Sequence, residues 1–427
     1  MSETVAATLA VVIFVGAYVL LATEKVHRTK VALVGAGLML VLHITDAEHA
    51  FFDEETAVDW NVVFLLLGMM VIVSVMRRTG IFEYIAILAA KRSRGRPYRL
   101  MVMLCVLTAV ASALLDNVTT VLLIAPVTFL VCERLGLKPV PFLIAEVLAS
   151  NIGGTATLVG DPPNIIIASR AGLTFNDFLV HLLPLVVFLM VVFCLMCRWL
   201  FRSAFSFNPE RAESVMSLNE REAITDPRLL IKSGVVLLAV VAAFVMHPVL
   251  HYEPSIVALL GAGVLVLITG VTTEEALSEV EWPTLVFFAG LFVMVGALVE
   301  TGSVGKVSEA MAGATEGRPV LAVLVLLFGS AGLSAIVDNI PYVATMSPVV
   351  AGLVPTEGPH VLWWALALGA DLGGNATAIG ASANVVMLGI AERAGHPIGF
   401  WQFTKYGALV ALVTITLSAP YLYLRYL

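Results

Sequence analysis

Acidic and amide side chains interrupt four otherwise apolar stretches of this sequence, and their chemistry suits the binding of a solute or an ion. Two stretches contain Asp116-Asn-Val-Thr119 and Asp338-Asn-Ile-Pro341. Two others contain the segments 153–164 and 373–384, which share the pattern Gly-Gly-x-Ala-Thr-x-x-Gly-x-x-x-Asn. An acid in hydrocarbon costs about 3 kcal/mol on insertion scales, so such residues usually line a path for an ion or a substrate. We expect binding and ion transfer at these places and no enzymatic chemistry, since no Ser/His/Asp or metal-ligand cluster appears outside the loops.

The elements that carry these residues are predicted to be membrane helices. Of the 427 residues, 59% are apolar and only 13% are charged, and the mean hydropathy is +0.97. Soluble domains carry about 25% charged residues. The apolar residues form long blocks, which predicts an all-α polytopic membrane protein. The net charge of −7 is spread over short loops without a basic run, which argues against a nucleic-acid partner. The four cysteines lie in or against apolar blocks and predict no disulfide framework.

A helix needs about 20 mostly apolar residues to cross the hydrocarbon. Spans are predicted at 5–23, 30–46, 60–79, 140–170, 178–201, 231–247, 254–270, 282–300, 361–395 and 403–424. The segment 5–23 is expected to be a retained helix and not a signal peptide, because a basic loop and a second apolar block follow it. The spans 140–170 and 361–395 are expected to be broken. The stretches 100–134 and 319–352 have arms of about 14–17 residues around a polar apex, which predicts two re-entrant hairpins.

The basic residues indicate the orientation of these spans, because cytoplasmic loops collect Lys and Arg. With the N-terminus outside, the predicted inner loops hold all 24 basic residues except Arg170, Lys306, Arg318 and Arg425. Both termini are then outside. We expect a multi-pass protein of the inner (plasma) membrane, surrounded by lipid.

The sequence repeats itself after about half its length. Segment 31–37 matches 257–263, Asp116-Asn117 matches Asp338-Asn339, and the offset between matches stays between 220 and 226. The predicted domains are a first repeat at 1–201, a cytoplasmic linker at 202–230 and a second repeat at 231–427. Each repeat has five crossings and one hairpin. Since five is odd, the second repeat is expected to be inverted. Inverted repeats with discontinuous helices are typical of secondary transporters, although channels also use re-entrant loops.

Unwound backbone within a membrane must be buried in protein or face water, so the two tips and two breaks are expected to converge. Asp161 and Ser382 are expected to cap half-helices whose N-termini attract the oxygens of a substrate. The predicted ion-coupling residues are Asp116, Asp338, Asp161 and Asp371. The predicted substrate-binding residues are Asn117, Thr119, Thr120, Thr155, Thr157, Asn164, Asn339, Asn375, Thr377, Ser382 and Asn384. Hydrogen bonding between helices is the alternative role for any single Asn or Thr.

The chain resembles the ArsB/NhaD branch of the ion transporter superfamily in motifs along almost its whole length. These motifs are Leu115-Asp-Asn-Val-Thr-Thr120, Asn151-Ile-Gly-Gly154, Gly160-Asp-Pro-Pro-Asn164, Asp338-Asn-Ile-Pro341 and Gly380-Ala-Ser-Ala-Asn-Val385. The resemblance includes bacterial arsenite/antimonite efflux proteins and the melanosomal P protein. It implies a scaffold domain and a transport domain that moves as an elevator, within a homodimer. More distantly similar sodium/dicarboxylate symporters carry Ser-Asn-Thr at the tips, where this chain has Asp116-Asn117-Val118 and Asp338-Asn339-Ile340.

The leading functional prediction is a secondary active transporter that couples protons to the efflux of a small oxyanion or metalloid, namely arsenite or antimonite. Aspartate in place of serine at the tips motivates proton coupling, because a carboxyl group shielded from water can exchange protons near neutral pH. The partners are then a small inorganic solute and a coupling ion, H⁺ or Na⁺. No cofactor and no metal site are predicted.

Three other functions stay open: a sodium/proton antiporter, an anion permease for dicarboxylate or chloride, and a passive anion channel. No embedded Arg or Lys is expected near the tips, which argues against a multivalent anion. The sequence has no Gly-x-x-x-x-Gly-Lys-[Ser/Thr] loop, so an ATP-driven pump would need a separate soluble ATPase subunit, docked on the loop 202–230.

Overall fold

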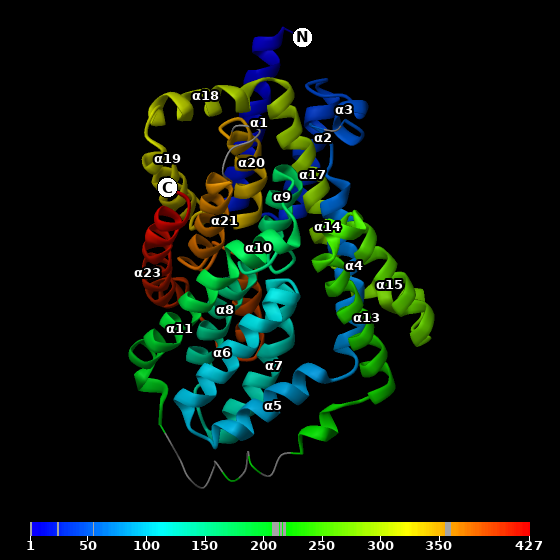
Figure 1. Cartoon of the computed structure of the whole chain (residues 1–427), viewed down its shortest axis with the longest axis vertical. Coiled ribbons are helices and arrows are strands. Elements are labelled where there is room, and N and C mark those ends of the chain that lie inside the picture. The colour runs from blue at the N-terminus through cyan, green and yellow to red at the C-terminus, as the bar shows by residue number, and fades with distance from the viewer. Residues whose placement is uncertain are drawn as a thin grey trace.

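The apolar stretches of the sequence form α-helices in the computed structural model of the chain (Figure 1). The structure describes residues 2–23, 25–53, 55–206, 213, 216, 219–354 and 360–427. Within these residues it has 22 α-helices and two short 3-10 helices, and no strand. Eight of the helices are long and apolar enough to cross a membrane. The fold is therefore all-α, as predicted.

The helices follow the same order in both halves of the chain. In the first half they are α1 (Glu3–Thr23), α2 (Arg28–Val41), α3 (Ala47–Phe51), α4 (Trp60–Arg77), α5 (Ile81–Ser93), α6 (Pro97–Leu114), α7 (Asn117–Leu135), α8 (Val140–Gly154), α9 (Pro162–Ala171), α10 (Phe175–His181) and α11 (Leu183–Leu200). In the second half they are α13 (Pro227–Val245), α14 (His247–Leu250), α15 (Pro254–Thr269), α16 (Thr273–Ser278), α17 (Trp282–Glu300), α18 (Ser303–Thr315), α19 (Pro319–Ser334), α20 (Asn339–Ala351), α21 (Val361–Gly374), α22 (Ser382–Arg393) and α23 (Phe400–Tyr426). Apart from the short α10 and α14, each helix has a counterpart, α1 with α13 through to α11 with α23.

Capping side chains and prolines set the starts of several helices. Asp59 accepts a hydrogen bond from the backbone N–H of Val62 (3.2 Å), at the start of α4. Asp226 accepts one from that of Leu229 (3.0 Å), at the start of α13. Such side chains satisfy N–H groups that have no partner within the helix. Proline stands in the first turn of α6, α9, α13, α15, α17 and α19, where its missing N–H costs nothing.

The contacts between helices define two groups. In one group α2 packs along α17 and α15 along α4, while α1 contacts α17 and α13 contacts α4. In the other, α6 packs along α8 and α19 along α21, with α7 against α22 and α20 against α9. Each of these contacts recurs between the counterpart helices. Figure 1 shows α4, α13 and α15 along one side of the molecule, and α11, α19 and α23 along the other.

Two glycines at counterpart positions allow the backbones of packed helices to approach closely. A Cβ atom on Gly153 of α8 would lie 2.3 Å from the carbonyl oxygen of Ala109 in α6. A Cβ atom on Gly373 of α21 would lie 2.5 Å from the Cα atom of Ala331 in α19. The helix before each break is thus pressed against the first arm of its own hairpin, in both halves.

The predicted breaks and hairpins correspond to helix ends in the structure. The span expected at 140–170 is α8 and α9, and the span expected at 361–395 is α21 and α22. The hairpin expected at 100–134 is α6 and α7, and that expected at 319–352 is α19 and α20.

The short arms predicted for the first hairpin were wrong, because α6 has 18 residues and α7 has 19. Pro97 starts α6 earlier than expected, and Asp116 caps α7, so only Leu115 and Asp116 lie between the two helices. In the second hairpin α19 has 16 residues and α20 has 13.

The expected linker 202–230 lies partly outside the described residues. Its described parts include the 3-10 helices Arg202–Ala204 and Glu220–Ala223. The latter is joined to α5 by a bond of 2.6 Å between Lys91 Nζ and Glu220 Oε2. The domain boundaries at 201 and 231 stay predictions.

Candidate functional site

The two chain breaks are fixed to the hairpins by the same hydrogen bond in each half. Thr157 Oγ1 donates to the carbonyl oxygen of Ala113 (2.6 Å), at the end of α6. Thr377 Oγ1 donates to the carbonyl oxygen of Ala335 (2.6 Å), just after α19. Both threonines were predicted to bind substrate. Their hydroxyl hydrogens hold the unwound backbone against the hairpin, and each hydroxyl oxygen also accepts a backbone N–H of its own break, so neither threonine has a hydrogen left for a ligand.

An asparagine bridges each break from the helix that follows it. Asn164 Nδ2 donates to the carbonyl oxygens of Gly154 and Thr157 (3.4 and 3.0 Å). Asn384 Nδ2 donates to the two corresponding carbonyl oxygens of the second break (2.9 and 2.8 Å). Each amide group thus uses both of its N–H hydrogens within its own break. Only its oxygen atom is left for a partner elsewhere.

The carboxyl group of Asp161 joins the tips of both hairpins. Asn117 Nδ2, at the start of α7, donates to Asp161 Oδ2 (2.9 Å). Asn339 Nδ2, at the start of α20, lies 3.3 Å from both carboxyl oxygens. The side chains are buried, with 0% exposure for Asp161, 2% for Asn117 and 1% for Asn339. The structure therefore brings both tips and the first break to one carboxyl group.

One capping prediction was wrong, and the other was confirmed only in position. Asp161 stands immediately before α9, but its side chain accepts no hydrogen bond from the first turn. Ser382 is the first residue of α22 and not its cap, which is Ala381. The Ser382 hydroxyl donates to Asp338 at the second tip. In both places the side chain is hydrogen-bonded to a hairpin tip and not to the first turn of its own helix.

Asn151 of α8 links the two halves, and it was not among the predicted site residues. Its Nδ2 donates to Asn375 Oδ1 (2.9 Å) and to Asn384 Oδ1 (3.0 Å). Its Oδ1 accepts from Asn117 Nδ2 (3.3 Å). The sequence did contain a signal for it, since Asn151 is the counterpart of Asp371 in the duplicated pattern.

Asp371 of α21 is fully buried against the first half of the chain. The side chains of Thr155 and Asn164 lie beside its carboxyl group. No donor among the described residues lies in hydrogen-bonding geometry to either carboxyl oxygen, and the same holds for Asn164 Oδ1. Two predicted site residues from different halves, Asp371 and Asn164, thus meet through acceptor atoms.

The first tip contains three further predicted site residues. Asp116 caps α7, accepting from the backbone N–H of Thr119 (2.8 Å) and from its hydroxyl group (2.5 Å). Thr120 is buried, and its hydroxyl oxygen has no hydrogen-bond partner in the described part of the chain. Within that part, no hydrogen bond joins these three residues to Asp161.

Arg28, the first residue of α2, reaches the second tip. Its guanidinium group donates to Ser382 Oγ and lies 4.0 Å from Asp338 Oδ2. It also donates to Thr284 Oγ1 of α17 (3.0 Å). Arg28, Asp338 and Ser382 border a cavity of about 320 Å³, which is lined also by His27. The expectation that no basic residue lies near the tips was therefore wrong. Arg28 lies 310 residues before Asp338 in the chain, and no local pattern marks its proximity to the tip.

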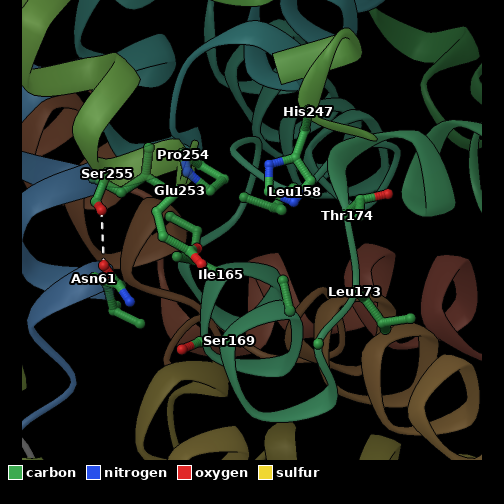
Figure 2. A pocket seen from close by; sticks show the side chains of 14 residues that line it. Asn61, Leu158, Ile165, Ser169, Leu173, Thr174, His247, Glu253, Pro254 and Ser255 are labelled. Atoms are coloured by element: carbon green, nitrogen blue, oxygen red, sulfur yellow. Dashed lines mark hydrogen bonds between the residues drawn. The ribbon is translucent and has the colours of Figure 1, made fainter. Parts of the chain in front are cut away.

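A second cavity, of about 190 Å³, lies at the counterpart position in the other half (Figure 2). Figure 2 shows Ser255 and Asn61 facing each other, joined by a hydrogen bond of 2.8 Å, with Ile165 and Ser169 of α9 on another wall. In the sequence repeat Pro254 is the counterpart of Arg28. Pro254 lines this cavity, as Arg28 lines the first one. The two cavities therefore share walls of the same kind but differ in charge.

Helices that span a membrane, two of them broken, and amide and carboxyl groups buried between their ends define a membrane transporter. The chain belongs to the citrate transporter family (CitMHS), whose sequence profile matches residues 18–369. Members of this family are transporters and not enzymes.

Relatives of known sequence support this assignment. An uncharacterized transporter of Mycobacterium tuberculosis is 59% identical over 421 residues, which cover 98% of this chain and 98% of that protein. The 46 kDa membrane protein of Mycobacterium leprae is 57% identical over 98% of this chain and 99% of its own length. The P protein of Mus musculus is 34% identical over 98% of this chain, which spans 60% of that protein.

Two solved structures share the fold. The YdaH transporter of Alcanivorax borkumensis superposes with a TM-score of 0.65 at 15% identity, covering 93% of this chain and 98% of its own. MtrF of Neisseria gonorrhoeae, from a class of antimetabolite efflux pumps, superposes with a TM-score of 0.61 at 13% identity, covering 97% and 94%.

Proposed function

We propose that this protein is a secondary active transporter that couples the movement of protons to that of a small, oxygen-rich solute. The observation that carries the proposal is the Asp161 carboxyl group, which binds Asn117 and Asn339 from the two hairpin tips. A buried acid at the meeting point of discontinuous helices is the arrangement in which transporters bind their coupling ion and substrate.

The two halves are proposed to be inverted repeats, and the second group of helices to move as an elevator against the first. The recurrence of each helix contact between counterparts supports a two-fold relation. The five predicted crossings per half support inversion. The polar contacts of Arg28 with Ser382 and Asp338 join α2 to the second tip, and an elevator movement would have to break them. Assembly as a homodimer and location in the plasma membrane belong to the same proposal.

A carboxylate or an oxyanion is the solute that the second tip supports best. Arginine presents a planar group of donors that matches two carboxylate oxygens. Arg28 and Ser382 line the same cavity as the start of α22, whose N-terminal N–H groups attract negative charge. The description of the family, citrate transporter, points to the same solute class.

Efflux of arsenite or antimonite is the second candidate, motivated by the resemblance to the ArsB/NhaD branch. The amide groups of Asn117, Asn151, Asn375 and Asn384 carry no charge, and to bind a neutral hydroxide they would have to exchange their hydrogen bonds to one another for bonds to the solute. A sodium/proton antiporter would differ from these two candidates in requiring sodium, and a passive anion channel in requiring no ion gradient.

The test is uptake into proteoliposomes of citrate, succinate, chloride, sodium, arsenite and antimonite, each with and without a pH gradient. We expect one of the oxygen-rich solutes to accumulate only when the gradient is imposed, and protein-free liposomes to show none. Flux that needs sodium and not protons would favour the antiporter. Flux that ignores both gradients and gives single-channel currents would favour the channel.

Two substitutions extend this test to the acids of the tips. Asp116→Asn and Asp338→Asn keep the size of each cap but remove its charge. If either carboxyl group carries the coupling proton, its variant loses the gradient-driven part of the flux. Undiminished flux in both would remove the tips from the proton path. A soluble ATPase subunit, if one docks on the loop 202–230, would show as ATP-dependent transport in membrane vesicles.

A further inference from the structure

One pair of buried counterpart positions carries an amide in the first half and an acid in the second. Asn151 on α8 corresponds to Asp371 on α21. The Asn151 amide nitrogen donates to the side-chain oxygens of Asn375 and Asn384 (2.9 and 3.0 Å). Donors therefore meet acceptors on this side of the contact between halves, and every side chain named is fully buried.

On the other side of the contact, acceptors meet acceptors. Asp371 lies beside Thr155 and Asn164, which are the counterparts of Asn375 and Asn384. The Thr155 hydroxyl hydrogen is used on a backbone carbonyl oxygen of α8 (2.9 Å). Both N–H hydrogens of Asn164 are used on carbonyl oxygens of the first break. What these neighbours offer to the Asp371 carboxyl group is oxygen lone pairs.

An ionised carboxylate cannot be satisfied in this place. It accepts hydrogen bonds and donates none, and a buried charge without a donor costs several kcal/mol, on the order of the effective desolvation penalty of an ion in a protein. A neutral carboxyl group has one O–H, which can donate to Asn164 Oδ1 or to Thr155 Oγ1. This single hydrogen would also satisfy an amide oxygen that is otherwise buried without a partner.

We propose that Asp371 carries the coupling proton of the transporter, held in the neutral form by the acceptor atoms of Asn164 and Thr155. The proposal rests on the proposed function of proton-coupled transport and names the residue that binds the proton. Asp161 is assigned the opposite role. It receives amide N–H donors from both tips, so its surroundings suit the ionised form.

The other ionisable side chains on the elements packed against α21 have separate partners or are exposed. Asp161, at the start of α9, is the acid on which the charge of Asp371 acts. Glu146 of α8 accepts from Thr128 (2.7 Å), and Tyr342 of α20 bonds Ser330 (2.9 Å).

Asp338, before α20, lies by Arg28. Arg170 of α9 donates to the Glu55 carbonyl oxygen, Lys405 and Arg425 of α23 are exposed, and no ionisable side chain lies on α19.

Proton release from Asp371 would place a second negative charge near Asp161 without a donor to receive it. The packing described above is stable only with the proton in place, so release must accompany a rearrangement of the breaks. The reaction is the loss of H⁺ from the neutral carboxyl group to give the carboxylate. No other bond forms or breaks. In this way the position of the transport elements and the protonation of one residue become linked.

Infrared spectroscopy of the purified protein at neutral pH tests the protonation directly and needs no substrate. We expect the difference spectrum of wild type minus Asp371→Asn to contain the C=O stretching band of a neutral carboxyl group. The matched difference for Asp161→Asn should contain the bands of an ionised carboxylate instead. An ionised signature for Asp371 would overturn the proposal. Loss of the neutral band when sodium chloride replaces choline chloride would assign a cation to the site, and would overturn it as well.

The second test measures transport by variants in which residues 151 and 371 are exchanged. The solute is the one that the wild-type protein accumulates in the proteoliposome experiment. Asp371→Asn should fold, since its counterpart is already asparagine, and it should lose the stimulation of solute uptake by a pH gradient. The double variant Asp371→Asn with Asn151→Asp moves the acid to the counterpart position, and we expect it to regain part of that stimulation. A single variant that keeps full stimulation would contradict the inference alone. Wild-type protein that shows no proton-driven flux of any solute would contradict the proposed function itself.

Discussion

The two chain breaks share their scaffold but differ in where they place an acid. In both, a threonine bonds the hairpin and an asparagine bridges the unwound backbone. The first break carries Asp161 in the loop and Asn151 on the helix before it. The second carries Ala381 in the loop and Asp371 on the helix before it. The duplicated threonines and asparagines hold the shape of both breaks, whereas the acids Asp161 and Asp371 have no acidic counterpart in the other half.

The comparison distinguishes residues that maintain the shape of the breaks from residues that could bind an ion. The identical threonines and asparagines of the two breaks bond backbone atoms, as Thr157 and Thr377 do. Residues that differ between the halves face the contact between them, as Asp161 and Asp371 do. A site that binds an ion equally from both halves cannot favour one direction of transport. Unequal acids allow the two halves to respond differently to a proton.

The largest effect is expected when the first break is made like the second. Asp161→Ala copies Ala381 and removes the acceptor of both Asn117 and Asn339. Each buried amide donor left without a partner costs about 1–3 kcal/mol, so we expect uptake in proteoliposomes to fall by more than about tenfold, with a lower unfolding temperature. As a control, Ala381→Ser alters the second break without touching this cluster. Normal uptake by Asp161→Ala would show that the tips do not depend on the shared acid.

The second largest effect is expected on KM, when the cavity beside Arg28 is made like the cavity beside Pro254. Arg28→Ala removes the guanidinium group that Pro254 lacks at the counterpart position. If the solute is a carboxylate, loss of a charge-assisted hydrogen bond of about 1.5–3 kcal/mol should raise KM by about tenfold or more.

The control for this prediction is Arg28→Lys, which keeps the charge but loses the planar donor pair, and it should recover only part of the affinity. Unchanged KM for both variants would exclude the cavity from the solute path.

A similar loss of stability in both halves is expected at the paired glycines. Gly153→Ala and Gly373→Ala each drive a methyl group into the adjacent hairpin arm, and such overpacking costs about 1–3 kcal/mol. Thermal unfolding in detergent should show comparable decreases for the two variants. Gly332→Ala, in a helix with open space around the added methyl group, should not lower the unfolding temperature. A large effect in one half only would mean that the packing is not shared.

The fold could be predicted well from the sequence because its signals are long and repeated. Apolar blocks bounded by polar residues gave the two hairpins and both breaks. The arms of the first hairpin were underestimated, because Pro97 and Asp116 set helix ends that apolar content alone does not mark.

The candidate site could be predicted only in part. The polar residues of the motifs do meet in the structure, and Asp161 and Asn117 are bonded to each other. Arg28 could not be found, because its proximity to Asp338 arises from packing between helices far apart in the chain. Asp161 stands at the predicted cap position but its side chain bonds the tips instead of its own helix, and Ser382 lies one residue past the cap and bonds Asp338.

The smallest effect is expected outside the duplicated core. Lys91 lowers the pKa of Glu220 below its ordinary value through a bond of 2.6 Å. An acid whose pKa is lowered on folding stabilises the protein above its ordinary pKa, and this stabilisation is lost as the pH falls through the lowered value. Glu220→Gln should therefore lower the unfolding temperature slightly at neutral pH and leave it unchanged in strong acid. An equal decrease at both pH values would point to packing and not to charge.

Cross-linking of the two hairpin tips tests the central claim most directly. Asn117→Cys and Asn339→Cys would be combined in a protein whose four cysteines (Cys105, Cys132, Cys194 and Cys197) have been replaced. Both amide nitrogens lie within 3.3 Å of the same Asp161 oxygen, so a short thiol cross-linker should join the tips within one folded chain. Mass spectrometry should then identify the linked peptides, while a control pair with Ser93→Cys in place of Asn117→Cys should give none. Failure of the tips to cross-link in a protein that unfolds at the temperature of the parent would contradict the shared site.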